Sequence, residues 1–249
     1  GGSGLKRFDG NAIATVAETD GLADNDVRDL LTDGDGVLWA GTANGLSRFD
    51  GKNWKTFLVP GEEPHFLWNM AVDLAGVRWY VPGNTGAAGA FYRYDDGAGL
   101  KTLRDDTASV NYRFSVTVDL RNRKWFGTQD GALCCEGDMV TKYTVAEGLA
   151  DNHVLIISAG PNGELWCGGN RGVSRFDGVA WKKFTESDGL AANTVRAICV
   201  ERNGAAWFGT TAGVSRFDGV SWKTYTETDG LASRYVYAAA VDSAGELWF

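Results

Sequence analysis

The chain has 249 residues, of which 44% are hydrophobic and ten are tryptophan, so it can bury a substantial core. Its formal net charge of −8 argues against a nucleic-acid-binding surface, which needs clustered basic residues. No apolar run approaches the roughly 18 residues of a membrane span, so we expect no membrane insertion of this chain.

One eight-residue motif recurs along the chain and defines its period. Gly-Val-Ser-Arg-Phe-Asp-Gly-Val occupies residues 172–179 and 213–220, and a close copy occupies 45–51. The aromatic position of the motif, or its equivalent, recurs at intervals of 41 or 45 residues: Phe8, Phe49, Tyr94, Cys135, Phe176 and Phe217. A period near forty is the sequence mark of a repeat architecture.

The unit that ends near residue 227 shows the predicted elements most clearly. Residues 193–200 are β-branched and apolar, and further short strands are expected at 205–210, 214–218 and 222–226, each after a small turn. Four short strands per repeat are typical of a propeller blade. The remaining predicted blades are, in chain order, 25–58, 66–104, 111–145 and 152–186, with the last repeat at 193–227.

Six tryptophans share one position of the second strand, which predicts six blades: Trp39, Trp79, Trp125, Trp166, Trp207 and Trp248. The chain starts and ends within a repeat, so residues 233–249 and 1–17 are expected to form one shared blade that closes the ring. We therefore predict an all-β, single-domain, six-bladed β-propeller over residues 1–249, with four antiparallel strands per blade. The start within a repeat, without Met, also predicts a piece of a larger protein.

The repeat resembles the two-component regulator propeller repeat. The resemblance rests on Leu-Trp-x-Gly-Thr, Gly-Leu/Val-Ser-Arg-Phe-Asp-Gly, Trp-Lys-Thr-Phe/Tyr and Thr-Asp-Gly-Leu-Ala-x-Asn-x-Val, and is most specific at 45–59 and 172–195. It implies the periplasmic or extracellular sensing part of a bacterial receptor, which binds a glycan or small solute. As an isolated domain, the chain is expected to be monomeric.

Most chemically suggestive residues have a structural interpretation. The Asp of the motif is expected to cap a turn rather than to act in catalysis, and residues 33–36 are expected to form a turn rather than a calcium loop. The four Cys lack metal-ligand spacing and are expected to be buried free thiols. With two His in the chain, we predict neither a metal site nor a cofactor, and no catalytic residues.

Candidate binding residues stand where the repeat varies. Three further tryptophans share a position of the fourth strand: Trp54, Trp181 and Trp222. Trp68 is the one tryptophan outside both columns, and its equivalents include Arg28, Phe114, Arg196 and Tyr237. A second variable column, two residues earlier, and a neighbouring His complete the predicted site at the channel mouth: Phe66, Tyr112, His153, Tyr235 and His65. Aromatic faces beside Arg suit a sugar or an acidic oligosaccharide.

A longer connection supports this sector as the site. Trp79 and Tyr94 are 15 positions apart, against 10 in the other uninterrupted repeats, and the extra residues fall at 82–89. Degeneration of one blade, with Trp68 filling a gap, is the alternative explanation. Two other functions stay open: a propeller lyase or hydrolase that uses residues such as His65 and His153, and a duplicated or engineered scaffold without a ligand.

Overall fold

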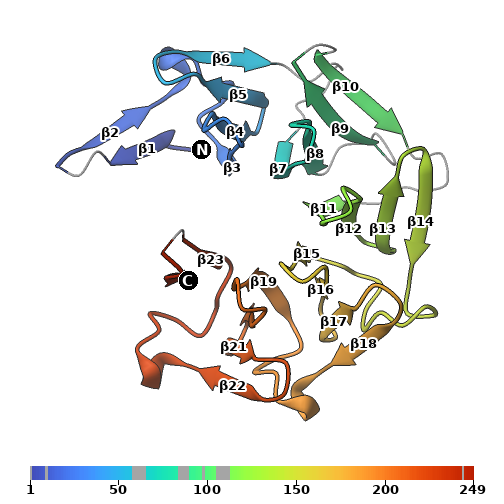
Figure 1. Cartoon of the computed structure of the whole chain (residues 1–249). Helices are drawn as coiled ribbons and strands as arrows, with labels where there is room; N and C mark the ends of the chain where they lie inside the picture. Colours follow the sequence, from blue (N-terminus) through green and yellow to red (C-terminus); the bar gives the residue numbers. More distant parts are fainter. Residues whose placement is uncertain are drawn as a thin grey trace. The chain divides into compact units, whose positions relative to one another are not determined.

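The computed structural model describes residues 2–8, 11–57, 66–83, 90–96, 99–104, 113–242 and 244–249. At residues 8, 66, 68, 82, 83, 90–92, 99–104 and 113 the description covers the main chain only. The chain divides into two compact units, Gly1–Phe114 and Ser115–Phe249. Both consist of antiparallel sheets joined by short turns (Figure 1). Five sheets have four strands and two have two strands, which confirms the predicted all-β class and the four-stranded repeat.

In the first unit, neighbouring strands of each sheet pair in chain order. The strands are β1 (Leu5–Phe8) and β2 (Ile13–Val16); β3 (Val27–Thr32), β4 (Leu38–Thr42), β5 (Gly45–Phe49) and β6 (Trp54–Phe57); and β7 (Phe66–Val72), β8 (Arg78–Gly83), β9 (Ala90–Asp95) and β10 (Gly99–Arg104). The longer connection predicted from the spacing of Trp79 and Tyr94 therefore lies between β8 and β9.

The second unit repeats this meander three times and ends on a strand pair. Its strands are β11 (Arg113–Val118), β12 (Lys124–Thr128), β13 (Gly131–Glu136) and β14 (Met139–Tyr143); β15 (Ile156–Ala159), β16 (Leu165–Gly168), β17 (Val173–Phe176) and β18 (Trp181–Phe184); β19 (Val195–Val200), β20 (Ala206–Thr210), β21 (Gly213–Phe217) and β22 (Trp222–Tyr225); and β23 (Ala240–Val241) with β24 (Leu247–Trp248).

Three connections contain a single turn of 3-10 helix: η1 (Glu18–Asp20), η2 (Glu186–Asp188) and η3 (Glu227–Asp229). One turn is too short to produce a helical period in the sequence, so these segments are compatible with the predicted all-β class. Each turn ends on a glycine with positive φ, as at Gly189 with φ 116°. A leucine follows each glycine: Leu22 and Leu190 are buried, and Leu231 is half-buried.

The tryptophan column supplies much of the core within each unit. The Trp39 ring lies 5.2 Å from that of Tyr94 in the neighbouring sheet, and the Trp166 ring lies 6.0 Å from that of Phe217. The buried members of the column are Trp39, Trp79, Trp125, Trp166 and Trp207. Trp248, the last member of the column, is 61% exposed. It lies in the pair β23–β24, where β24 has no third strand of its own sheet beside it.

The recurrent motif is accounted for by packing. In the copy at 213–219, the Arg216 guanidinium lies over the Trp207 ring at 5.7 Å. Phe217 packs on Trp222 with ring centroids 4.8 Å apart. The same two contacts recur in the copies at 45–51 and 172–178. These cation–π and aromatic contacts explain why Arg and Phe repeat.

The polar members of the motif hold turns and connections. Asp218 Oδ1 accepts the amides of Val220 and Ser221, which confirms the predicted turn-capping role. The buried Ser215 Oγ accepts the amide of Ala191, 24 residues earlier in the chain, at 2.8 Å. Equivalent bonds join Ala23 to Ser47 and Ala150 to Ser174. The motif is thus a scaffold motif, and binding residues must be sought outside it.

All four cysteines are buried free thiols, as predicted. Across the described segments, no helix combines the length and apolar character that crossing a membrane requires.

Candidate ligand-binding site

A β-bulge recurs in the first strand of three sheets. The pairing register shifts between Val27 and Asp29 in β3, between Leu67 and Asn69 in β7, and between Val195 and Ala197 in β19. The residues that these shifts leave outside the pairing are Arg28, Trp68 and Arg196. A bulge bends the strand and redirects the side chain of the extra residue. Three predicted site residues therefore share one special backbone position.

The bulge of β3 lies beside an open pocket of about 430 Å³. The pocket is lined by Gly4, Leu5, Lys6 and residues 27–30. Arg28 is exposed and forms an ion pair with Asp26, and Lys6 adds a second cation at the rim. The pocket therefore combines two basic side chains, each with a partner in the chain, with the side chain of Asp29.

Within the first unit, Asp29 links the bulges of β3 and β7. Its Oδ2 accepts the Met70 amide at 2.7 Å and the Asn69 side-chain amide at 3.3 Å, while Oδ1 accepts the Leu30 amide. Burial raises the pKa of Asp29 from 3.8 to about 6, although these hydrogen bonds oppose the rise. The sequence analysis did not identify this carboxylate.

The other predicted residues differ in their surroundings. Arg196 is exposed, Phe114 is half-buried, and Tyr237 is 70% exposed. Tyr235 accepts a hydrogen bond from Arg234 Nη2 at 2.6 Å, and the guanidinium lies over its ring. Four predicted positions fall wholly or in their side chains outside the described part of the chain: His65, Tyr112, Phe66 and Trp68.

His153 lies in a separate pocket of the second unit, with Gln129, Asp151 and Arg171 in its lining. The Asn170 side-chain amide lies 2.8 Å from His153 Nδ1. Apart from His153, the sequence analysis missed this group. A usable signal was present, because Gly169 interrupts the Trp-x-Gly-Thr pattern that three other repeats keep.

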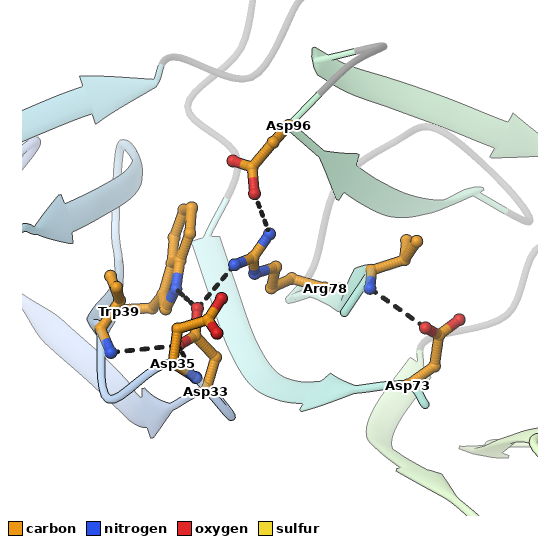
Figure 2. Close-up of polar contacts among 8 residues, drawn as sticks. Asp33, Asp35, Trp39, Asp73, Arg78 and Asp96 are labelled. Atoms are coloured by element: carbon orange, nitrogen blue, oxygen red, sulfur yellow. Dashed lines mark hydrogen bonds and ion pairs between the residues drawn. The ribbon is translucent and has the colours of Figure 1, made fainter. Parts of the chain in front are cut away.

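The acidic turn at residues 33–36 is structural, as expected. Asp33 Oδ1 accepts hydrogen bonds from the backbone amides of Asp35 and Val37. Its Oδ2 accepts hydrogen bonds from Trp39 Nε1 at 2.8 Å and from Arg78 Nη2 at 2.6 Å (Figure 2). Burial would raise the pKa of Asp33, but the bonds from Arg78 and Trp39 outweigh it and hold the pKa below its ordinary value. Within the described residues, no group of three His, Cys, Asp or Glu side chains could hold a metal.

Residues 21–44 match the family model described as Two component regulator propeller. Over these residues the chain is similar to the two-component regulator propeller repeat. This match confirms the predicted resemblance. A search of the curated proteins found no match.

Several solved structures share the β-propeller fold of this chain. The extracellular domain of a B. thetaiotaomicron protein, described as a hybrid two component system, aligns with a TM-score of 0.81 and 22% identity, over 99% of this chain and 35% of that one. Virginiamycin B lyase from Staphylococcus aureus aligns with a TM-score of 0.72 and 15% identity, over 90% of this chain and 77% of the lyase. An ancestral GH74 enzyme aligns with a TM-score of 0.70 and 18% identity, over 90% of this chain and 36% of the enzyme. At these identities the likeness shows the fold alone.

Proposed function

We propose that the chain is a non-catalytic, ligand-binding β-propeller module of a larger bacterial receptor, exposed to the periplasm or the exterior. The observation that carries this proposal is the recurrent bulge at Arg28, Trp68 and Arg196. The scaffold motif keeps its residues from repeat to repeat, whereas the equivalents of this position vary among Arg, Trp, Phe, Tyr and, at Leu155, an aliphatic residue. Variation at one redirected position suits recognition rather than folding.

The ligand is a glycan or a small polar solute. An indole can stack on the apolar face of a sugar ring, and a guanidinium can hold hydroxyl or carboxylate groups through paired hydrogen bonds. The basic rim of the pocket at Lys6 and Arg28 supports a polar ligand in the first unit. The likeness to the extracellular domain supports a sensor, and this chain spans about a third of that domain's length.

An enzymatic function is the second candidate, since the fold is shared with virginiamycin B lyase. The two candidates make different predictions for incubation with an acidic polysaccharide. A lyase or hydrolase shortens the polymer, which size-exclusion chromatography detects, whereas a binding module only raises its own melting temperature. We expect the second result.

We further propose that the seven sheets form six blades, with β1–β2 and β23–β24 sharing one blade, in a monomeric protein. Joined end to start, the sequence reads through the repeat with one residue missing relative to 207–219. A ring closed in this way leaves no blade with only two strands, and its remaining sheet edges are short and protected. Deletion of residues 230–249 should therefore give an insoluble or molten product. A monomeric truncate with a sharp unfolding transition would contradict closure.

The site is tested with Trp68→Ala. A thermal-shift screen of sugars, uronates and amino acids identifies a ligand for the parent, and calorimetry then compares the variants. We expect Trp68→Ala to keep the parent melting temperature and lose roughly 1–3 kcal/mol of affinity. Trp222→Ala is the control for the loss of an indole within the scaffold, and it should lower stability instead. A stable Trp68→Ala variant with parental affinity would show that the bulge is not the site.

A further inference from the structure

A second pocket, of about 410 Å³, opens in the second unit around His153. Its lining comes from the β12–β13 turn, the connection that precedes β15 and the β16–β17 turn, and consists of Gln129, Val145, Asp151, Asn152, His153 and Arg171. These three segments lie at the same end of their sheets, where β12 and β16 end. The turns from which β12 and β16 begin lie at the opposite end. The pocket is therefore separate from the turns at residues 119–123 and 160–164.

The repeat is interrupted at this pocket. In three other repeats, a buried Thr donates its hydroxyl to the carbonyl of the glycine that ends the turn, as Thr128 does to Gly131 at 2.8 Å. Gly169 replaces that Thr. A Cβ at Gly169 would lie 2.5 Å from the His153 carbonyl oxygen and 3.0 Å from Asp151 Cβ. The loss of the Thr thus permits the close approach of the connection that carries His153.

The polar groups of the pocket are held in place by one another. The Asp151 carboxylate accepts the His153 amide through Oδ1 and the Asn170 amide through Oδ2, at 3.1 and 2.9 Å. The Asn170 side-chain amide lies within hydrogen-bond distance of His153 Nδ1, at 2.8 Å. These bonds fix the ring and engage both carboxylate oxygens.

The polar groups of the pocket that are not engaged by one another are mostly hydrogen-bond donors. Asn152 Oδ1 accepts the Val145 amide at 2.8 Å, which leaves the Asn152 side-chain NH₂ group to donate. Arg171 is exposed and contributes a guanidinium, and Gln129 contributes an exposed amide. Arg pairs with carboxylates through two parallel hydrogen bonds, and amide groups suit hydroxyls.

We propose that this pocket binds a small carboxylate with neighbouring hydroxyl groups, the chemistry of a uronic acid. Arg171 holds the carboxylate, while Asn152 and Gln129 bind the hydroxyls. The proposal rests on the proposed ligand-binding function, and it places an acidic sugar in the second unit, apart from the bulges of β3 and β7.

The test uses calorimetry of the full chain with three probes: D-glucuronate, D-glucose and acetate. Glucuronate should bind at least tenfold more tightly than either glucose or acetate. Arg171→Ala should weaken glucuronate binding at least tenfold and leave glucose unaffected, and Arg171→Lys should fall between them because Lys lacks the paired donors. Arg121→Ala is the control. It removes an exposed Arg from the turn between β11 and β12, at the opposite end of the sheet, and it should bind glucuronate as tightly as the parent does. All variants should keep the parent melting temperature.

Two outcomes would overturn the proposal without touching the proposed function. One is glucuronate binding that Arg171→Ala leaves unchanged and Trp68→Ala abolishes. The other is a parent that binds a different solute at the bulges and shows no preference for glucuronate. Failure of the parent to bind any solute in the screen would instead overturn both. Selective loss in Arg171→Ala alone would support the pocket as the uronate site.

Discussion

The Arg78 guanidinium donates to the Asp33 carboxylate at 2.6 Å, and both side chains are almost fully buried, with 5% and 2% of their surfaces exposed. This bond joins β8 to the turn that precedes β4 in the neighbouring sheet (Figure 2). Arg78 also lies over the Trp39 ring at 4.7 Å and reaches the exposed Asp96 at 2.9 Å. Apolar residues, such as Leu38 and Leu165, hold the corresponding position in several other sheets.

Arg78→Ala should lower the free energy of unfolding by about 3–5 kcal/mol, because it leaves the buried Asp33 charge without its cation. Chemical denaturation of the purified chain measures the change. Asp96→Ala is the matched control: its carboxylate is 66% exposed, so its removal should cost less than about 1 kcal/mol. Equal losses in both variants would show that the ion pair with Asp33 carries no special weight.

The turn before β16 lacks a contact that the other repeats make. Each remaining column Trp donates its indole N–H to a carboxylate six residues earlier, as Trp125 does to Asp119 at 2.8 Å. At the equivalent position stands Gly160, and Trp166 Nε1 is buried with no hydrogen-bond partner among the described residues. The Glu164 side chain occupies the space, since a Cβ at Gly160 would lie 2.2 Å from its Oε1.

The double variant Gly160→Asp/Glu164→Val should therefore stabilise the protein by about 1 kcal/mol, by supplying the missing acceptor and removing the clash. Gly160→Asp alone should destabilise it, because Glu164 stays in place. Thermal melts of the parent, both single variants and the double variant separate these effects. Additive single effects would refute the coupling between the two positions.

Asp29 predicts an unusual pH dependence. Its pKa in the folded chain is about 6, above the ordinary 3.8, so the folded state favours the protonated form. The ionised Asp29 carboxylate destabilises the folded state fully at pH values above 6. This destabilisation decreases as the pH falls from about 6 to about 3.8, and it vanishes below about 3.8. A tenfold change in an acid dissociation constant corresponds to about 1.4 kcal/mol, so the raised pKa amounts to an effect on the order of 2–3 kcal/mol.

Asp29→Asn should remove this contribution, so that the difference in stability between parent and variant shrinks as the pH falls from 7 to 4. Denaturation at several pH values measures it. Asp35→Asn, which removes an exposed carboxylate of the same unit, should change the profile little. A parallel profile for parent and Asp29→Asn would contradict the raised pKa.

Trp166→Ala should cost roughly 3–5 kcal/mol through lost burial and the cavity that it leaves. The ring is 1% exposed and packs against Phe184, Phe208 and Phe217. Val179→Ala, at a position that is 91% exposed, provides the surface control in the same sheet region. A Trp166→Ala variant that melts within a degree or two of the control would place this column outside the core.

The fold was largely predictable because the repeat displays its rules several times. The four-stranded unit, the buried Trp column and the turn-capping Asp all follow from residues that recur at the same spacing. Trp248 shares the spacing of the column, but the sheet that holds it has two strands, and residue identity does not reveal the number of strands.

The sites were less accessible from sequence. The bulges at Arg28 and Arg196 involve no special residue type, so only the pairing register reveals them. Burial beside Asn69 and Met70, which lie about forty residues away in the chain, raises the pKa of Asp29, and this burial is not visible in the local sequence. The pocket around His153 depends on Gly169, whose meaning appears only when the absent Thr is compared with its equivalents.

The bonds from Ala23, Ala150 and Ala191 to their serines each span 24 residues and end within the sheet that the connection enters. In these three repeats, the leading segment is therefore held by a residue of the same repeat. Contacts of short sequence separation form early and cost little loop entropy. During synthesis, a repeat can acquire its internal order soon after its third strand has emerged from the ribosome, so that successive repeats add to an already ordered neighbour.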